Sequence, residues 1–467
     1  MSEMPRPMGL HQRVDRQRRI SRRQLLKAGA FVGGTALLSA CAAPSTPAVD
    51  ESARTAPVTA PSGGEKSLTV WAHRSFAPPA DDVLIANINQ WAEKNSVKLD
   101  LVAEIEVPIM NERTVAAIES GNLPDVFAVS GFRVALHYPA NVYADLSELY
   151  KEMSDKHGGF FRTAEQVATI DGKQWVIPYS IDTSLTYYRQ DILDKKGQKI
   201  PETWEEYVTV LKAAQTPPEI YGSGIALNKQ ATDAEFTFGT MMHSFGAHFV
   251  AEDGKTLTVN TPEMEQFLEF VTGPFYQSGI LPPGVFEWDN ASNNKAYQEE
   301  SVISIENPAS VLVWLLNNKP ELAKATAIRN PPAGPKGRFS QAYARVNWAV
   351  SNRSSKDKQA LGMDLIRYLL EPDQFEPWIS KAFAAPAAKR YESMELWKDP
   401  QRAAFLESAK NGIMTGYPGP ITVAATELDS RAPVVSMILR VLVDKFSIKD
   451  AIAEAEKVAK DVYSKYY

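Results

Sequence analysis

The chain has 467 residues, of which 44% are hydrophobic and 23% are charged. This length predicts more than one globular domain, and the balance excludes a mostly disordered chain and a protein with many membrane spans. The net charge of −6 disfavours nucleic-acid binding, and the single cysteine excludes an intramolecular disulfide and a cysteine-rich metal site.

The first forty residues are strongly basic, with eight Lys or Arg against two acidic residues. Arg22 and Arg23 precede a weakly apolar run over residues 28–40, which ends at Cys41. That run is too short to cross a hydrocarbon core of about 30 Å. The paired arginines resemble a twin-arginine export signal, although Leu25 stands where that pattern prefers Phe. Residues 38–41, LSAC, resemble a lipobox, so we expect residues 1–40 to be a signal peptide and Cys41 to carry lipid.

Residues 41–66 are rich in Pro, Ala, Ser and Thr and show no apolar period. This composition predicts a flexible, disordered tether between the lipid and a folded body.

The folded body begins near Ser67 with a short apolar strand, SLTVWAH. A helix is predicted from about Asp81, followed by a strand over residues 98–105, a helix around 111–119 and a strand over 125–130. This βαβαβ order is typical of a parallel sheet covered by helices.

Two later helices have clear start signals. Thr203 is expected to cap a helix while Glu206 reaches back to complete a capping box. Thr261 is expected to cap another, with Pro262 at its first position. In that helix Met264, Phe267, Leu268 and Val271 are spaced to form one buried face.

Common catalytic motifs are absent from the sequence: it contains no phosphate-binding glycine loop, no GxSxG and no HExxH. His243 and His248 are five residues apart, which does not align them on one helical face, so we expect surface or packing roles. Glu104 and Glu106 alternate along a strand, an arrangement that favours solvated side chains over a catalytic pair.

Aromatic residues gather where strands are predicted to end. In open α/β sheets ligands bind beyond these ends, and flat aromatic faces suit sugar rings. Ordinary core packing is the alternative for each of them. They are Trp71, Phe76, Phe132, Tyr179, Trp288, Trp348, Phe383 and Tyr417.

The segment over residues 170–214 resembles the family 1 extracellular solute-binding proteins, the substrate-binding subunits of carbohydrate ABC importers. Its matching elements are DGKQWVIP (171–178), YRQDIL (188–193) and PETWEE (201–206). Flanking matches in the same order are SGNLPDVFAVS (120–130), YADLSEL (143–149) and AYQEESVISIENPAS (296–310). The resemblance extends over nearly all of residues 67–467.

The resemblance implies the α/β, two-lobed periplasmic-binding-protein fold of type II, with a hinge between the lobes. The first lobe is expected to comprise residues 67–182 and 346–382, and the second residues 183–345 and 383–467. The chain is thus expected to cross near Asp182, Val346 and Phe383.

The resemblance also implies a ligand site between the lobes. Residues 73–76 match the family's first polar ligand loop, residues 130–132 a second loop, and Asp182 a hinge carboxylate that grips sugar hydroxyls. Ala309 departs from the Trp found in many relatives, which leaves other aromatic and polar residues to replace it. The implied ligand-binding residues are His73, Arg74, Ser75, Phe76, Ser130, Phe132, Tyr179, Asp182, Trp288, Asn290, Asn307, Trp348 and Tyr417.

The implied protein is not an enzyme. It is an extracytoplasmic lipoprotein, tethered to the cell membrane through Cys41, that captures a sugar or oligosaccharide and delivers it to an ABC permease. It is expected to be monomeric and to need neither metal nor cofactor. The same fold binding a glycerophosphodiester or a polyamine remains an alternative, and a glycosidase is a third.

Overall fold

The computed structural model describes residues 66–467 except residues 76, 105, 106 and 132. The predicted signal peptide, the tether and Cys41 lie outside the described residues. So do Phe76 and Phe132, two of the expected ligand-binding residues.

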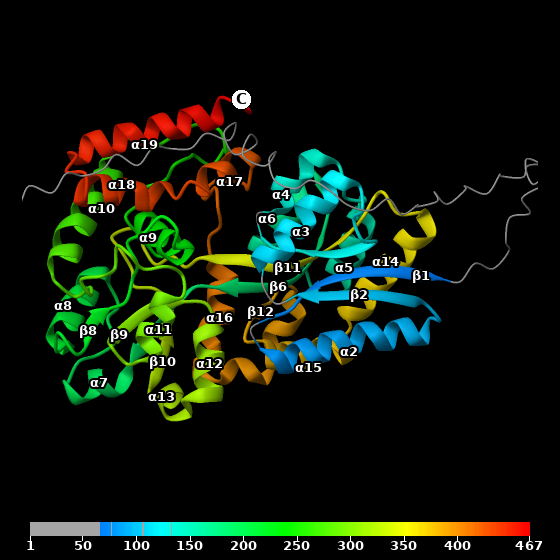
Figure 1. Ribbon diagram of the computed structural model, residues 1–467, viewed down its shortest axis with the longest axis horizontal. Coiled ribbons are helices and arrows are strands. Elements are labelled where there is room, and N and C mark those ends of the chain that lie inside the picture. Colours follow the sequence, from blue (N-terminus) through cyan, green and yellow to red (C-terminus); the bar gives the residue numbers. More distant parts are fainter. Residues whose placement is uncertain (1–65, 76, 105–106, 132) are drawn as a thin grey trace, which may run out of the picture. The chain divides into compact units, whose positions relative to one another are not determined.

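The predicted βαβαβ unit is present at the start of the described chain (Figure 1). It consists of β1 (Ser67–His73), α2 (Pro78–Lys94), β2 (Lys98–Glu104), α3 (Val107–Ser120) and β3 (Val126–Val129). β1 pairs in parallel with both β2 and β3. Helix α2 buries Leu84, Ile88 and Trp91, and it begins at Pro78, whose fixed φ suits a first helical turn.

Six strands form the sheet of the first lobe, in the order β12-β6-β11-β3-β1-β2. The three further strands are β6 (Ile177–Thr183), β11 (Ala342–Val350) and β12 (Ala385–Pro386), and all their pairings in this sheet are antiparallel. The short strands β4 (Thr169–Ile170) and β5 (Lys173–Gln174) form a separate pair. The helical elements of this half are α4 (Arg133–His137), η2 (Tyr138–Ala140), α5 (Ser147–Lys156), α6 (Arg162–Ala168), α14 (Lys356–Leu369), α15 (Pro372–Ala382), η4 (Lys389–Ser393) and η5 (Glu395–Lys398).

Four strands form the sheet of the second lobe, in the order β10-β7-β9-β8. They are β7 (Leu185–Arg189), β8 (Tyr221–Ser223), β9 (Val302–Asn307) and β10 (Thr326–Arg329). The helical elements around them are α7 (Gln190–Lys195), α8 (Trp204–Ala214), α9 (Thr232–Ser244), α10 (Pro262–Phe270), η3 (Val271–Phe275), α11 (Ser292–Gln298), α12 (Ser310–Asn318), α13 (Pro320–Lys324), α17 (Val423–Asp429), α18 (Pro433–Leu442) and α19 (Ile448–Tyr463).

The predicted caps of α8 and α10 are both formed. Thr203 accepts a hydrogen bond from the Glu206 amide at 3.2 Å, and Thr261 accepts one from the Met264 amide at 3.3 Å. The capping box differs from the prediction, because the Glu206 carboxylate accepts from the Glu202 amide, one residue before the cap. The predicted face of α10 is buried, with Met264, Phe267 and Leu268 at 0% exposure.

Three segments run side by side where the chain passes between the two sheets. The Ser184 amide donates to the Gln341 carbonyl at 2.9 Å, and the Ala342 amide donates to the Ile413 carbonyl at 3.0 Å. A Cβ on Gly412 would lie 2.3 Å from that of Ala342, so the close approach requires glycine there. Helix α16 (Pro400–Asn411) leads into the third of these segments and packs against strands of both sheets.

Two of the expected crossing points between the lobes do not coincide with the ends of the strands in the first sheet. β11 enters the first sheet at Ala342, four residues before the expected return near Val346. β12 still pairs with β6 at residues 385–386, so the chain has not left the first sheet at Phe383. These short pairings depend on distant partners, which local sequence does not specify. The exact lobe boundaries stay a prediction.

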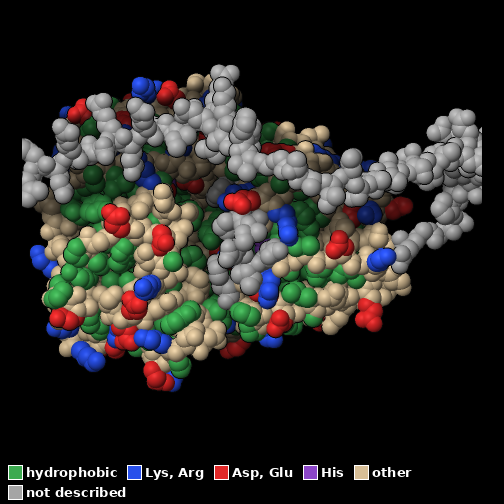
Figure 2. All heavy atoms as spheres, in the orientation of Figure 1, with side chains coloured by type: hydrophobic (Ala, Val, Ile, Leu, Met, Phe, Trp, Pro, Cys, Tyr) green, Lys and Arg blue, Asp and Glu red, His purple; other side chains and the backbone are tan. Residues whose placement is uncertain are grey.

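Lys and Arg side chains are interspersed with Asp and Glu over the face seen in Figure 2. Such mixing keeps electric fields of a single sign small over that face.

Candidate functional site

A cavity of about 990 Å³ lies between the two lobes, and we call it the main cavity. One wall comes from the first lobe, through Pro78, Ser130, Gly131 and Arg133. The other comes from α9, α11, the end of β9 and α12, all in the second lobe. β11 supplies Tyr343 and Arg345 at its base.

Amide side chains dominate the wall from the second lobe. Asn294 and Gln298 are four residues apart on α11 and line the cavity from one side of that helix, and Asn290 lines it from the turn before α11. Asn307, Asn317 and Asn318 add further amides from the end of β9 and from α12. An amide both donates and accepts hydrogen bonds, which suits hydroxyl groups.

Asp233 at the start of α9 organises part of this amide wall. Its Oδ2 accepts hydrogen bonds from Asn307 Nδ2 at 3.1 Å and from Asn293 Nδ2 at 3.2 Å. Asn307 Nδ2 also donates to Asn294 Oδ1 at 2.5 Å. Burial raises the pKa of Asp233 to about 6, although the Asn293 amide opposes the rise. These contacts fix the amides before any ligand arrives.

Glu306 lies behind this wall and is 2% exposed. Burial raises the pKa of Glu306 to about 8, and the charge of Asp233 adds to the rise. The carboxyl is therefore mostly protonated at neutral pH, and it belongs to the support of the wall.

The base of the main cavity contains an aromatic pair from both lobes. Phe236 of α9 and Tyr343 of β11 have ring centroids 5.9 Å apart, tilted by 36°. Both residues line the cavity, as does Trp314 of α12. These three rings are the apolar surfaces that a sugar face can contact in the described residues.

A buried ion pair lies beside the aromatic pair. Arg345 Nη1 donates to Asp182 Oδ2 at 2.6 Å, and the two side chains are 7% and 12% exposed. Burial opposes ionisation of Arg345, but the charge of Asp182 raises its pKa above the ordinary value. Asp182 is thus paired within the protein, and its expected contact with sugar hydroxyls stays a prediction.

The first polar loop lines a smaller cavity of about 20 Å³ next to the main one. His73, Arg74, Ser75 and Asp182 all border it, and Arg345 borders both cavities. Burial, with the charges of Arg345 and Arg133, lowers the pKa of His73 to about 3, so its imidazole is neutral.

Asp81 holds this loop in place. Its Oδ1 accepts a hydrogen bond from the Ser75 amide at 2.5 Å, and its Oδ2 lies 3.6 Å from Arg74 Nε. Burial raises the pKa of Asp81, and the bonds from Ser75 oppose the rise.

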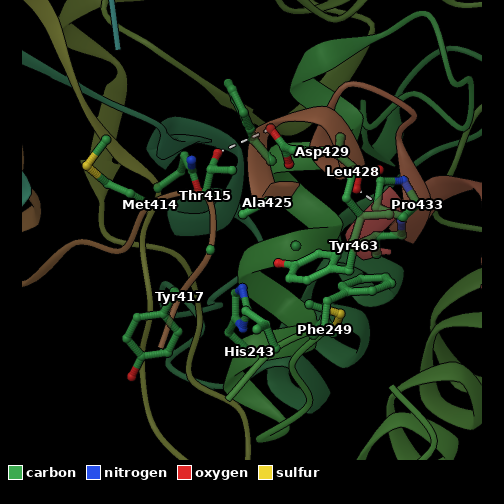
Figure 3. A pocket seen from close by; sticks show the side chains of 18 residues that line it. His243, Phe249, Met414, Thr415, Tyr417, Ala425, Leu428, Asp429, Pro433 and Tyr463 are labelled. Atoms are coloured by element: carbon green, nitrogen blue, oxygen red, sulfur yellow. Dashed lines mark hydrogen bonds between the residues drawn. The ribbon is translucent and has the colours of Figure 1, made fainter. Parts of the chain in front are cut away.

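The structure brings only part of the expected site together. Ser130, Asn290 and Asn307 line the main cavity. Tyr417 lines an adjoining side pocket, shown in Figure 3.

Three expected aromatic residues lie elsewhere. Tyr179 and Trp348 are 0% exposed in the core of the first lobe, where their rings contact each other at 6.2 Å. Trp288 packs against the core of the second lobe. Sequence position placed these residues near strand ends, but the side chains point into the core.

Several lining residues were missed by the sequence analysis. Asp233 and Phe236 are three apart on α9, and Tyr343 and Arg345 alternate along β11, so each pair shares one face. These spacings were the available signal. His243 and His248 were expected in surface or packing roles, and the turn after α9 brings their Nδ1 atoms to 2.8 Å with the rings stacked.

Two α/β lobes around a large cavity lined by amide and aromatic side chains define a two-lobed binding protein. Residues 86–404 match the family model described as bacterial extracellular solute-binding protein. The chain belongs to this family. Within the described residues, no helix has the length and apolar character needed to span a bilayer.

Curated relatives are about a quarter identical to this chain over the segments that align. A probable ABC transporter-binding protein of Deinococcus radiodurans is 24% identical over 289 residues, which cover 60% of this chain and 66% of that protein. An arabinooligosaccharide-binding protein of Halalkalibacterium halodurans is 27% identical over 238 residues, covering 49% of this chain and 50% of that protein. The matches thus span between half and two thirds of these two relatives.

Solved structures share the fold at lower identity. A maltose-bound MalE3 of T. maritima superposes with a TM-score of 0.70 at 21% identity, covering 85% of this chain and 99% of that one. A cyclic α-maltosyl-1,6-maltose binding protein of Arthrobacter globiformis gives a TM-score of 0.72 at 17% identity, covering 86% and 100%. The two-lobed fold expected from the sequence is confirmed.

Proposed function

We propose that the protein captures a neutral oligosaccharide in the main cavity and delivers it to the permease of an ABC importer. The observation that carries the proposal is the amide-lined wall held by Asp233, facing aromatic rings contributed by both lobes. Amides satisfy hydroxyl edges and aromatic rings cover apolar sugar faces, so this wall has the chemistry of sugar recognition.

The size and charge of the main cavity support an uncharged ligand of several sugar units. Its volume of about 990 Å³ is at the upper end of the range for small-molecule sites. The cationic lining residues Arg133 and Arg345 are balanced by Asp233 and by Asp182, which pairs with Arg345. An arabinooligosaccharide-binding protein among the relatives supports the oligosaccharide class.

The family is one of binding proteins, and we propose binding without catalysis. Lobe closure about the three side-by-side segments would enclose the ligand, and the closed pair of lobes would be the form that the permease recognises.

We also propose that residues 1–40 direct export and that lipid on Cys41 holds the protein at the outer side of the cell membrane. The support is the ordered series of an arginine pair, a short apolar run and the single cysteine.

A thermal-shift screen tests the ligand class, using residues 64–467, which form one compact unit. The panel contains neutral oligosaccharides, glycerophosphodiesters and polyamines. A ligand at 100 times its Kd stabilises by about 2.7 kcal/mol, enough for a shift of a few degrees. A response to phosphodiesters or polyamines alone would replace the sugar proposal, and turnover of a glycoside would overturn the binding-only proposal.

A further inference from the structure

A side pocket adjoins the main cavity on the side of the C-terminal helices (Figure 3). It lies between α9, the segment at residues 414–417, α17, the start of α18, and Tyr463 at the end of α19. Phe236, Gln341, Met414 and Thr415 line both spaces, so the side pocket is continuous with the wall of the main cavity.

Two buried carboxyl groups line the side pocket. The oxygens of Glu235 accept hydrogen bonds from the Val434 and Val435 amides at 3.0 and 2.9 Å. Asp429 Oδ2 accepts a hydrogen bond from Thr415 Oγ1 at 3.2 Å (Figure 3). Each carboxyl group has more acceptor positions than these bonds use.

The hydroxyl group of Tyr463 is directed into the same space. Tyr463 is 4% exposed, and its hydroxyl makes no hydrogen bond of good geometry among the described residues. Burial raises the pKa of this hydroxyl, and a weaker interaction with the Thr422 side chain opposes the rise. Figure 3 shows it pointing between His243 and Ala425. A buried hydroxyl whose hydrogen bonding is incomplete is costly, and a ligand group that reaches it would reduce that cost.

The protonation of the lining residues favours hydrogen-bond donors. Burial, and then the charge of Asp429, raise the pKa of Glu235 to about 8, while burial raises the pKa of Asp429 to about 6. Burial and the neighbouring His248 lower the pKa of His243 to about 3, so His243 is neutral. At neutral pH Glu235 is then mostly protonated, as Glu306 is, so Asp429 supplies the main acceptor oxygens, and none of Glu235, Asp429 and His243 carries a fixed positive charge.

The volume of the side pocket is about 70 Å³, room for about two water molecules. It is too small for a sugar ring but sufficient for one substituent. We propose that the side pocket binds a small hydrogen-bond-donating substituent, a hydroxymethyl or an amino group, on the sugar held in the main cavity. This inference rests on the proposed sugar-binding function and adds a selectivity for the substituent.

Tyr463→Phe tests the side pocket with little structural change, because it removes only the hydroxyl group. The full chain and its variants are titrated with maltotriose, cellotriose, arabinotriose and the β-1,4-linked glucosamine trimer. For a trimer that the wild type binds, we expect the Kd to rise about fivefold in Tyr463→Phe. Tyr466→Phe is the matched control, since its hydroxyl bonds to Glu427 outside the side pocket, and its Kd should not change.

A second variant, Ala425→Leu, fills the side pocket and should weaken binding about tenfold or more. If it fails to fold, Tyr463→Phe still decides the question. Wild-type affinity of Tyr463→Phe for every bound trimer would overturn the inference and leave the sugar-binding function intact. A wild-type protein that binds none of a wider sugar panel would overturn the proposed function, and the inference with it.

Comparison of the glucosamine trimer with cellotriose identifies which hydrogen-bond donor of the ligand enters the side pocket. They differ by an amino group in place of a hydroxyl group on each unit. Tighter binding of the glucosamine trimer, lost in Tyr463→Phe, would assign an amino group to the side pocket. Equal or tighter binding of cellotriose with the same loss would assign a hydroxyl group.

Discussion

Arg345 of β11 and Asp182 of β6 form an ion pair of 2.6 Å at the point where the first sheet meets both cavities. The neighbouring residue Tyr343 is the register partner of Asp182, and a β-bulge follows Ala344. Arg345 lies two residues beyond Tyr343 on β11, so its side chain is on the same side of the sheet as Asp182 and reaches it. The pair thus neutralises two charges beside the proposed ligand.

Asp182→Asn separates a structural role from a ligand-binding role. Because both side chains are buried, loss of the carboxylate should lower the free energy of unfolding by about 3 kcal/mol, measured by urea denaturation. The double variant Asp182→Asn with Arg345→Gln should recover part of this loss. An unchanged urea midpoint together with a raised Kd would show that Asp182 contacts ligand directly.

Phe236→Ala should weaken sugar binding about tenfold, because Phe236 supplies one ring of the pair that joins α9 to β11 in the main cavity. Calorimetric titration with the best trimer measures the change. Phe446→Ala serves as control, since Phe446 is 40% exposed and lines neither the main cavity nor the side pocket. Equal sugar affinities for the two variants would show that Phe236 does not contact the ligand.

Glu306→Gln should flatten the pH dependence of stability. The ordinary pKa is 4.5 and burial raises the folded value to about 8, so the folded state binds more protons between these values. Wild-type stability should therefore fall as pH rises from about 4.5 to 8, by at most about 1.4 kcal/mol per pH unit from this group. Urea unfolding across that range checks the slope, with exposed Glu93→Gln as control. Parallel slopes in wild type and Glu306→Gln would contradict the assignment.

Gly412→Ala should destabilise the hinge region by about 2 kcal/mol or more, because its Cβ would lie 2.3 Å from Ala342 Cβ and 2.5 Å from the Ser408 carbonyl oxygen. Gly273→Ala is matched to it, since no atom lies within 4 Å of the added carbon. The thermal midpoints of the two variants measure the difference in stability. An unchanged midpoint for Gly412→Ala would mean that the three segments can move apart to accommodate the added carbon.

Cys41→Ser should abolish fatty-acid incorporation and release the protein from the membrane fraction. Arg22→Lys with Arg23→Lys should block export by the twin-arginine route. The neighbouring pair Arg18 and Arg19, changed to Lys in the same way, keeps the same charge and should leave export intact. Equal export of both double variants would favour the general route.

Sequence patterns predicted the local structure well. Strand alternation in SLTVWAH, the spacing of Leu84, Ile88 and Trp91, and the caps at Thr203 and Thr261 all depend on neighbours a few residues away. The ordered motifs led to the two-lobed fold. The sequence did not predict that the chain passes between the sheets at Gly412 or that β12 pairs with β6. Both features depend on contacts between distant segments.

The sequence predicted only part of the site, because it does not show in which direction each side chain points. Ser130, Asn290 and Asn307 were expected from their loops and line the main cavity. Tyr179 and Trp348 come from equally plausible positions but lie in the core, since facing strands decide which side of a sheet becomes buried. The amides of α11 were overlooked although their spacing places them on one helical face.

By itself, the sequence determined the family resemblance, the helices and strands and the expectation of an export signal with a lipid site, since these depend on local pattern and order. Only the tertiary structure decided that Asp182 is paired with Arg345, that Phe236 meets Tyr343, and that Tyr463 points into a side pocket. Each joins residues far apart in the chain, and such contacts form only when both lobes and the segments between them are folded.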